Sequence, residues 1–168
     1  SVGGTVTLNG SIVTSNDAVV LGAVTLASAT TIDTNSSDTT GDITIGAVTG
    51  GSNSLTLSTG DNVANTDISA SGAISGVTTL TLADVGGTAT LSADVDVTTL
   101  SVNNTVANVV FTGNGSYVID AVALANAGTL TLGVNGGTPD SYEHLTTPTK
   151  GGVETSTCDV TTKKAAIE

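Results

Sequence analysis

A short alternating unit recurs along most of the chain: an aliphatic residue, a threonine and a second aliphatic residue. In an extended strand, this order places the two aliphatic side chains on one face and the threonine on the other. Up to residue 91 the copies follow one another at intervals of 18, 19, 12, 25 and 9 residues. Degenerate self-similarity of this kind predicts a repeat architecture of short strands. The copies are Val6–Leu8, Val24–Leu26, Ile43–Ile45, Leu55–Leu57, Leu80–Leu82, Ala89–Leu91 and Leu130–Leu132.

Glycine and asparagine separate the units. The best-preserved example is Leu80–Leu91, where two alternating segments flank Gly86 and Gly87, and we expect a corner between stacked strands there. Asn9-Gly10 directly after the first unit predicts a tight turn. No helical periodicity of useful length occurs before residue 160, so we expect little helix.

Three all-β architectures fit this pattern: a parallel β-helix (solenoid), an antiparallel β-sandwich as in a pilin-like subunit, and a β-barrel. Hydrophobic residues make up 38% of the chain and aromatic residues only 2%. A thin interior of stacked small aliphatic side chains suits this composition, whereas sandwich cores usually contain larger rings. We therefore predict the parallel β-helix. With roughly 20 residues per coil, the repeats would form about seven coils, on the order of 30 Å long.

The repeat pattern ends near residue 137. We predict a β-repeat domain over residues 1–137 and a distinct C-terminal segment over 138–168, acting as a cap, a linker or a contact segment. This segment contains both prolines, the histidine, the cysteine, all lysines and all glutamates.

The charge balance excludes several partner classes. The formal net charge is −12, and residues 1–149 contain no lysine or arginine. Binding to phosphate backbones or to anionic membrane surfaces depends on such residues, so neither is expected. No apolar stretch is long enough for a membrane span, and no signal peptide is visible. Cys158, the single cysteine, has no intramolecular disulfide partner.

Few residues suggest chemistry. Ser141, Glu143 and His144 are adjacent in a predicted loop and lack the strand–turn–helix that presents a nucleophile, so we expect no catalytic triad. Calcium is the one cofactor that the sequence leaves open, because carboxylates flank one polar loop and occupy alternate positions farther on. The weak candidate ligands are Asp33, Asp38, Asp42, Asp94 and Asp96. We otherwise expect no cofactor and no metal.

Outward threonines on a β-helix can order water and bind ice. The Thr-x-Thr units at residues 5–7, 88–90 and 129–131 are irregularly spaced and do not recur once per coil. We therefore expect ordinary solvent-facing strand residues. Asn-x-Ser/Thr sequences begin at residues 9, 35, 103 and 114, as expected by chance in so polar a chain.

Segments such as Gly22–Ser28, Gly41–Gly46, Ser54–Leu57 and Gly128–Gly133 resemble the repeats of filamentous-haemagglutinin-like and autotransporter-like bacterial surface adhesins. The resemblance covers residues 1–137 and lies in composition and repeats. It implies a right-handed parallel β-helix located on, or outside, a bacterial cell.

We therefore expect a non-catalytic structural or adhesive segment of a secreted bacterial surface protein, acting as a stiff stalk. Its partners would be neighbouring repeats, further copies of the chain, or a host or environmental surface. The alternative is a subunit of a self-assembling extracellular filament, joined by strand exchange through a terminal segment. A polysaccharide-active β-helix enzyme is a distant third, because basic and aromatic residues are missing from the repeats.

Overall fold

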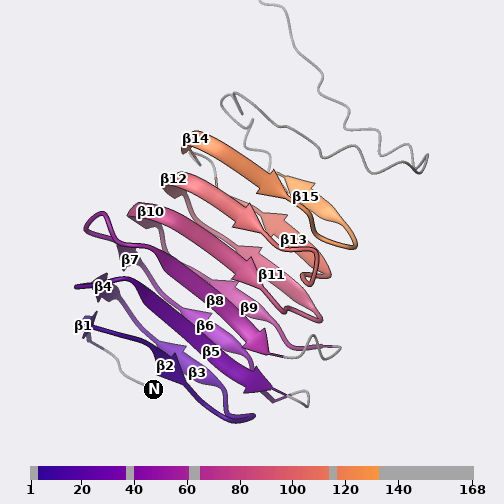
Figure 1. The fold of residues 1–168 in the computed structure, drawn as a ribbon, viewed down its shortest axis with the longest axis horizontal. Coiled ribbons are helices and arrows are strands. Elements are labelled where there is room, and N and C mark those ends of the chain that lie inside the picture. The colour runs from indigo at the N-terminus through magenta and orange to yellow at the C-terminus, as the bar shows by residue number, and fades with distance from the viewer. Residues whose placement is uncertain (1–3, 37–39, 61–64, 114–116, 133–168) are drawn as a thin grey trace, which may run out of the picture.

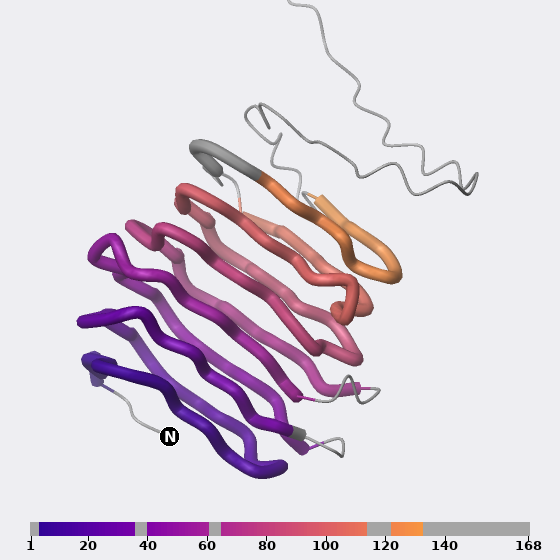
Figure 2. The backbone as a smooth tube through the Cα atoms, viewed as in Figure 1, coloured from indigo at the N-terminus to yellow at the C-terminus, as the bar shows by residue number. Residues whose placement is uncertain are grey.

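The computed structural model describes residues 4–36, 40–60, 65–113 and 117–132. They form fifteen β-strands and no helix. The chain winds as a parallel β-solenoid, with successive coils stacked as layers (Figures 1 and 2). Every pairing between described strands is parallel, which confirms the predicted β-helix and excludes the antiparallel sandwich.

Two sheets line the solenoid. The six-stranded sheet contains β3 (Val19–Leu21), β6 (Ile43–Ile45), β9 (Ile68–Ala70), β11 (Thr88–Leu91), β13 (Asn108–Phe111) and β15 (Leu130–Leu132). The nine-stranded sheet contains β1 (Val6–Leu8), β2 (Ile12–Val13), β4 (Val24–Leu26), β5 (Thr30–Ser36), β7 (Val48–Thr49), β8 (Leu55–Gly60), β10 (Ile74–Ala83), β12 (Val95–Val102) and β14 (Tyr117–Leu124).

The nine-stranded sheet changes character along the stack. In the first three coils, each coil contributes two short strands to it, such as β7 and β8. In the later coils one long strand replaces the pair: β10 pairs with β7 through Ile74 and with β8 through Leu80. A register irregularity between Ser75 and Val77 marks the position of the lost corner.

The prediction of about seven coils was wrong. The six-stranded sheet receives one strand from each coil. From its first strand to its sixth, the described chain therefore makes about five turns. The coils are longer than expected because paired residues are up to 26 positions apart, as Val48 and Ile74 are. At about 4.8 Å per coil, this stack is on the order of 24 Å long.

Coil length varies mostly at one corner, which joins the nine-stranded sheet to the six-stranded sheet. Ile32 and Ile43 are 11 positions apart across it, whereas the equivalent Leu82 and Ala89 are 7 apart. The span between the two strands of the nine-stranded sheet also varies, from 6 positions between Val6 and Ile12 to 9 between the equivalent Val48 and Leu57, so this corner holds the largest share of the extra residues. We call it the variable corner.

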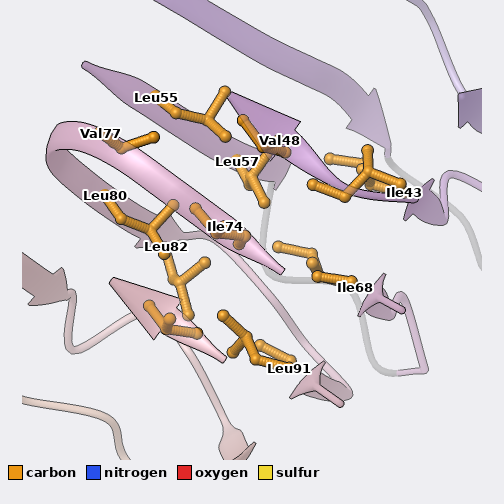
Figure 3. Packing of buried hydrophobic residues seen from close by; sticks show 14 of the residues in the cluster. Ile43, Val48, Leu55, Leu57, Ile68, Ile74, Val77, Leu80, Leu82 and Leu91 are labelled. Carbon is orange, nitrogen blue, oxygen red and sulfur yellow. The ribbon is translucent and has the colours of Figure 1, made fainter. Parts of the chain in front are cut away.

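Aliphatic side chains from both sheets fill the interior (Figure 3). Buried and outward positions alternate in β4, β6, β9 and β11, so that Ile43 and Ile45 are buried while Thr44 between them is not. Phe111 is the one aromatic residue among the described buried side chains. The predicted thin, aliphatic core is confirmed.

Four of the five buried hydroxyl residues lie at the variable corner, and the fifth, Thr30 at the start of β5, donates its Oγ1 hydrogen to the carbonyl of Ser28 at 3.1 Å. Thr34 Oγ1 donates to the carbonyl of Gly41 at 2.6 Å, and Thr59 Oγ1 lies 2.9 Å from Thr66 Oγ1. Among the described residues, no buried side-chain polar atom lacks a partner. This matters because an unpaired polar group in so apolar an interior would be costly.

Glycines at the corners have two separate causes. At some corners the backbone needs a positive φ, which Gly10, Gly51 and Gly76 adopt. At others the next coil leaves no room for a side chain: a Cβ on Gly46 would lie 2.9 Å from the carbonyl carbon of Gly22, one coil below. The predicted Gly86–Gly87 corner is of this second kind, because a Cβ on Gly87 would collide with Asp67.

The alternation within β6 makes a matched test of the core. Ile45→Ala removes a side chain that is 1% exposed, and we expect it to lower the free energy of unfolding by about 2–5 kcal/mol. Thr44→Ala, at the adjacent outward position, should change it by less than about 0.5 kcal/mol. Urea unfolding followed by circular dichroism measures both. Equal losses would contradict the inward–outward assignment.

The close approach between coils can be tested with alanine at glycine. A Cβ on Gly50 would lie 2.5 Å from the nitrogen of Val77, so Gly50→Ala must push two coils apart. We expect a loss of about 1–3 kcal/mol in unfolding free energy. Gly4→Ala is the control, because nothing lies within 4 Å of its added Cβ. A thermal melt that is unchanged for Gly50→Ala would rule out this close packing.

Candidate functional site

Aspartates are the only charged side chains in the described part of the chain. Several flank the variable corner: Asp17, Asp42, Asp67 and Asp84. Polar chemistry in the described solenoid therefore depends on carboxylates, hydroxyls and amides. We take these groups in turn.

The first group is a hydroxyl between two carboxylates. Ser58 Oγ, on β8, lies 3.5 Å from Asp33 Oδ1 of the coil below and 3.4 Å from Asp84 Oδ2 of the coil above. One hydroxyl has one proton, so it donates to only one carboxylate at a time. Asp33 Oδ1 also accepts the backbone N–H of Asn35 at 2.8 Å. The Ser58 hydroxyl therefore links its coil either to the coil below or to the coil above at any one time.

The second group is a ladder of side-chain oxygens on the six-stranded sheet. Asp42 Oδ1 accepts the N–H of Asp67 at 2.8 Å, and Asp67 Oδ1 accepts the N–H of Thr88 at 2.7 Å. Asn108 Oδ1 accepts the N–H of Thr129 at 3.0 Å. Asp42 and Asp67 stand directly before a strand, Asn108 is the first residue of β13, and each bonds an amide one coil above. We call these residues the amide ladder.

The calcium candidates do not converge in the described structure. Asp33 and Asp42 belong to the two groups above, on opposite sides of the variable corner. Asp94 and Asp96 are exposed on either side of buried Val95, as expected for alternate positions. Asp38 lies outside the described residues. No three His, Cys, Asp or Glu side chains gather among the residues described. Calcium binding thus stays a prediction.

The residues considered for nucleophilic catalysis, Ser141, Glu143 and His144, also lie outside the described residues, as does the whole segment 138–168. The absence of catalysis therefore stays a prediction. Within the part of the chain that the structure describes, Ser58 is the hydroxyl placed between carboxylates, and no histidine accompanies it.

The third group is a face covered by hydroxyls. On β5, β8, β10 and β12 the outward residues stack in register: Thr31 pairs with Thr56, Thr56 with Thr81, and Thr81 with Ser101. Two positions earlier a second row runs beside it, because Thr79 pairs with Thr99 and Ser54 precedes the paired Leu55. We call these seven residues the hydroxyl face: Thr31, Ser54, Thr56, Thr79, Thr81, Thr99 and Ser101.

The hydroxyl face was not predicted from the sequence. The Thr-x-Thr units at residues 5–7, 88–90 and 129–131 were expected not to recur once per coil, and the face is formed by other residues, whose hydroxyls recur in four successive coils. These residues do not stand out at linear spacing. The register of coils of unequal length decides which threonines pair, so that Thr56 and Thr81 align although they are 25 positions apart.

Comparisons with known proteins add no assignment: no family model, no curated protein and no solved structure matches the chain. The described residues also contain no helix long and apolar enough to cross a membrane.

The amide ladder was also missed, although a sequence signal exists. Asp42 and Asp67 each directly precede a buried isoleucine that begins a strand, and Asn108 stands before Val109 in the same way. A carboxylate or amide at a strand start can accept a neighbouring backbone N–H. Asp67 was not singled out because it lies in a stretch with weak alternation.

The amide ladder predicts a difference between two aspartates. Asp67→Ala removes the acceptor of the Thr88 N–H, and we expect the free energy of unfolding to fall by about 1 kcal/mol. Asp67→Asn keeps an oxygen acceptor and should restore most of it. Asp96→Ala, at an exposed strand position, is the control and should cost less than about 0.5 kcal/mol. Urea midpoints that rank the two alanine variants in the opposite order would refute the ladder.

Proposed function

We propose that this chain is a stiff β-solenoid stalk segment of a secreted bacterial surface protein, with a structural or adhesive role. The observation that carries the proposal is the continuous pairing of coils around a dry aliphatic interior. Bending such a rod would break backbone hydrogen bonds and open the packed ladders at the same time. Stiffness is the property that a stalk needs.

The polar exterior supports a location outside the cell. A net charge of −12 opposes non-specific association, and the outward side chains are mostly threonine and serine. The resemblance to bacterial adhesin repeats points the same way. Neighbouring repeats of the same protein would then be the first partners of the end coils.

A filament subunit is the second candidate, and the first coil favours it. β1, β2 and β3 lie at the end of their sheets, and each pairs with one strand only. The N–H of Val6 bonds Ala23 of the second coil, so the N–H of the next residue, Thr7, points toward the open edge. Val13 and Val20 of this coil are 68% and 45% exposed. Such an edge can pair with a strand of another copy.

Electron microscopy of the purified chain separates the two candidates. The stalk predicts single short rods at all concentrations, and the filament predicts regular fibres. If fibres form, Thr7→Pro should abolish them, because it removes an N–H on the open edge without removing a hydrogen bond inside the chain.

Deletion of residues 138–168 tests the other means of joining. Fibres that persist without this segment but vanish with Thr7→Pro would place the junction at the first coil. Regular fibres from the intact chain would contradict the monomeric stalk segment, and single particles at all concentrations would contradict the filament. Glycan turnover that is lost on replacing Asp94 and Asp96 would instead indicate an enzyme.

A further inference from the structure

We propose that the hydroxyl face binds ordered water in the form of ice. This inference is independent of the stalk function, since it concerns one outer face of the solenoid and not its stiffness or its ends. It rests on three observations: the two-dimensional regularity of the face, its unused hydrogen-bonding capacity and its lack of charge.

The face is regular in two directions. Coils repeat at about 4.8 Å, and alternate residues of one strand stand about 6.6–7 Å apart. Its two rows therefore form a grid whose spacings are close to repeats of the oxygen lattice in ice. The backbone beneath is fixed on the inner side, because Leu55, Leu80 and Leu100 between the rows are at most 3% exposed. Threonine is also stiff at χ1, so its methyl and hydroxyl groups hold their places.

The hydroxyls of the face are not used inside the protein. Within the described residues, none of the seven side chains forms a hydrogen bond with another protein group. Hydroxyls at the corners behave differently: Thr34, Thr59 and Thr78 each bond a backbone carbonyl of another segment. The donors and acceptors of the hydroxyl face are therefore left for water, and partly buried positions between methyl groups hold that water in fixed places.

The two rows of the face contain no charged residue, although Asp33 borders them two positions after Thr31 on β5. On the six-stranded sheet, the row Val20, Thr44, Ser69, Thr90 and Val110 is interrupted by valines and runs beside Asp42 and Asp67. On β1, β4, β7 and the start of β10, a single row leads to Asp96. Charged groups retain their own hydration shells, which do not fit a crystal lattice of water. The two rows of the hydroxyl face contain no such group, and the residues that follow Asp33 along its border in the next two coils, Ser58 and Ala83, are uncharged.

The test uses the full chain and ice itself. A polycrystalline ice surface is grown slowly into a dilute solution, and the protein in the ice is compared with the protein left in the liquid; thermal hysteresis is measured in parallel. We expect the chain to enter the ice and to lower the freezing point below the melting point. Thr81→Lys, at the centre of the face, should bring both readouts to the level of a non-binding protein.

Matched variants keep the test decisive. Thr90→Lys places the same charge on an outward threonine of the six-stranded sheet and should leave ice binding unchanged. Thr56→Lys, one coil from Thr81, should repeat the loss, which protects the result if one variant folds poorly. Melting temperatures by circular dichroism establish that the compared variants are folded.

Three outcomes would overturn the proposal. The first is exclusion of the wild-type chain from ice. The second is that Thr81→Lys and Thr56→Lys enter ice as well as the wild type does. The third is that Thr90→Lys abolishes ice binding as completely as they do. Analytical ultracentrifugation measures whether the chain forms a dimer. If the wild-type chain does not bind ice but forms a dimer that Thr81→Lys dissociates, the hydroxyl face is instead the contact surface for a second copy.

Discussion

The hydrogen bonding of each coil to the next one, strand on strand in parallel register, is the interaction on which the rest of this molecule depends. A single coil of about 20 residues has almost no interior and could not fold alone. Pairing in register places similar side chains of successive coils on top of one another, so that Val6, Val24 and Val48 form one ladder. Each ladder then excludes water from its neighbours, and stability accumulates from coil to coil as in other repeat proteins.

This pairing brings backbones very close, and the remaining composition follows from that constraint. Gly46 and Gly87 stand where a side chain would meet the coil below. Large rings would widen the narrow interior, and Phe111 near the end of the described stack is the exception. Polar groups that the corners bury are bonded to the chain itself, as Thr34 and Thr59 are. The alternation of outward and inward residues, the stacked aliphatic ladders and the glycines at the corners therefore all follow from the close parallel stacking of the coils.

Much of this architecture could be predicted from local sequence, because alternation is a property of single strands. The units at Val6–Leu8 and Leu80–Leu82 are strands, and Gly86–Gly87 is a corner. Register was harder to predict, since it depends on coil length. Residues 60–79 carry only isolated aliphatic residues without regular alternation, yet Ile68, Ile74 and Val77 are all buried, because strands of the neighbouring coils pack against them. The hydroxyl face was missed for the same reason.

The variable corner has a consequence for how such a chain can change over time. Residues added between Ile32 and Ile43 leave every ladder on both sides in place, whereas one added within β10 would shift its outward residues inward. Insertions and deletions are thus accommodated at the corners, above all at the variable corner, and within a strand only where a bulge absorbs the added residue, as between Ser75 and Val77. A lineage of such chains should diverge in length chiefly along this one edge, which is also where new loops could be displayed with the least effect on the ladders.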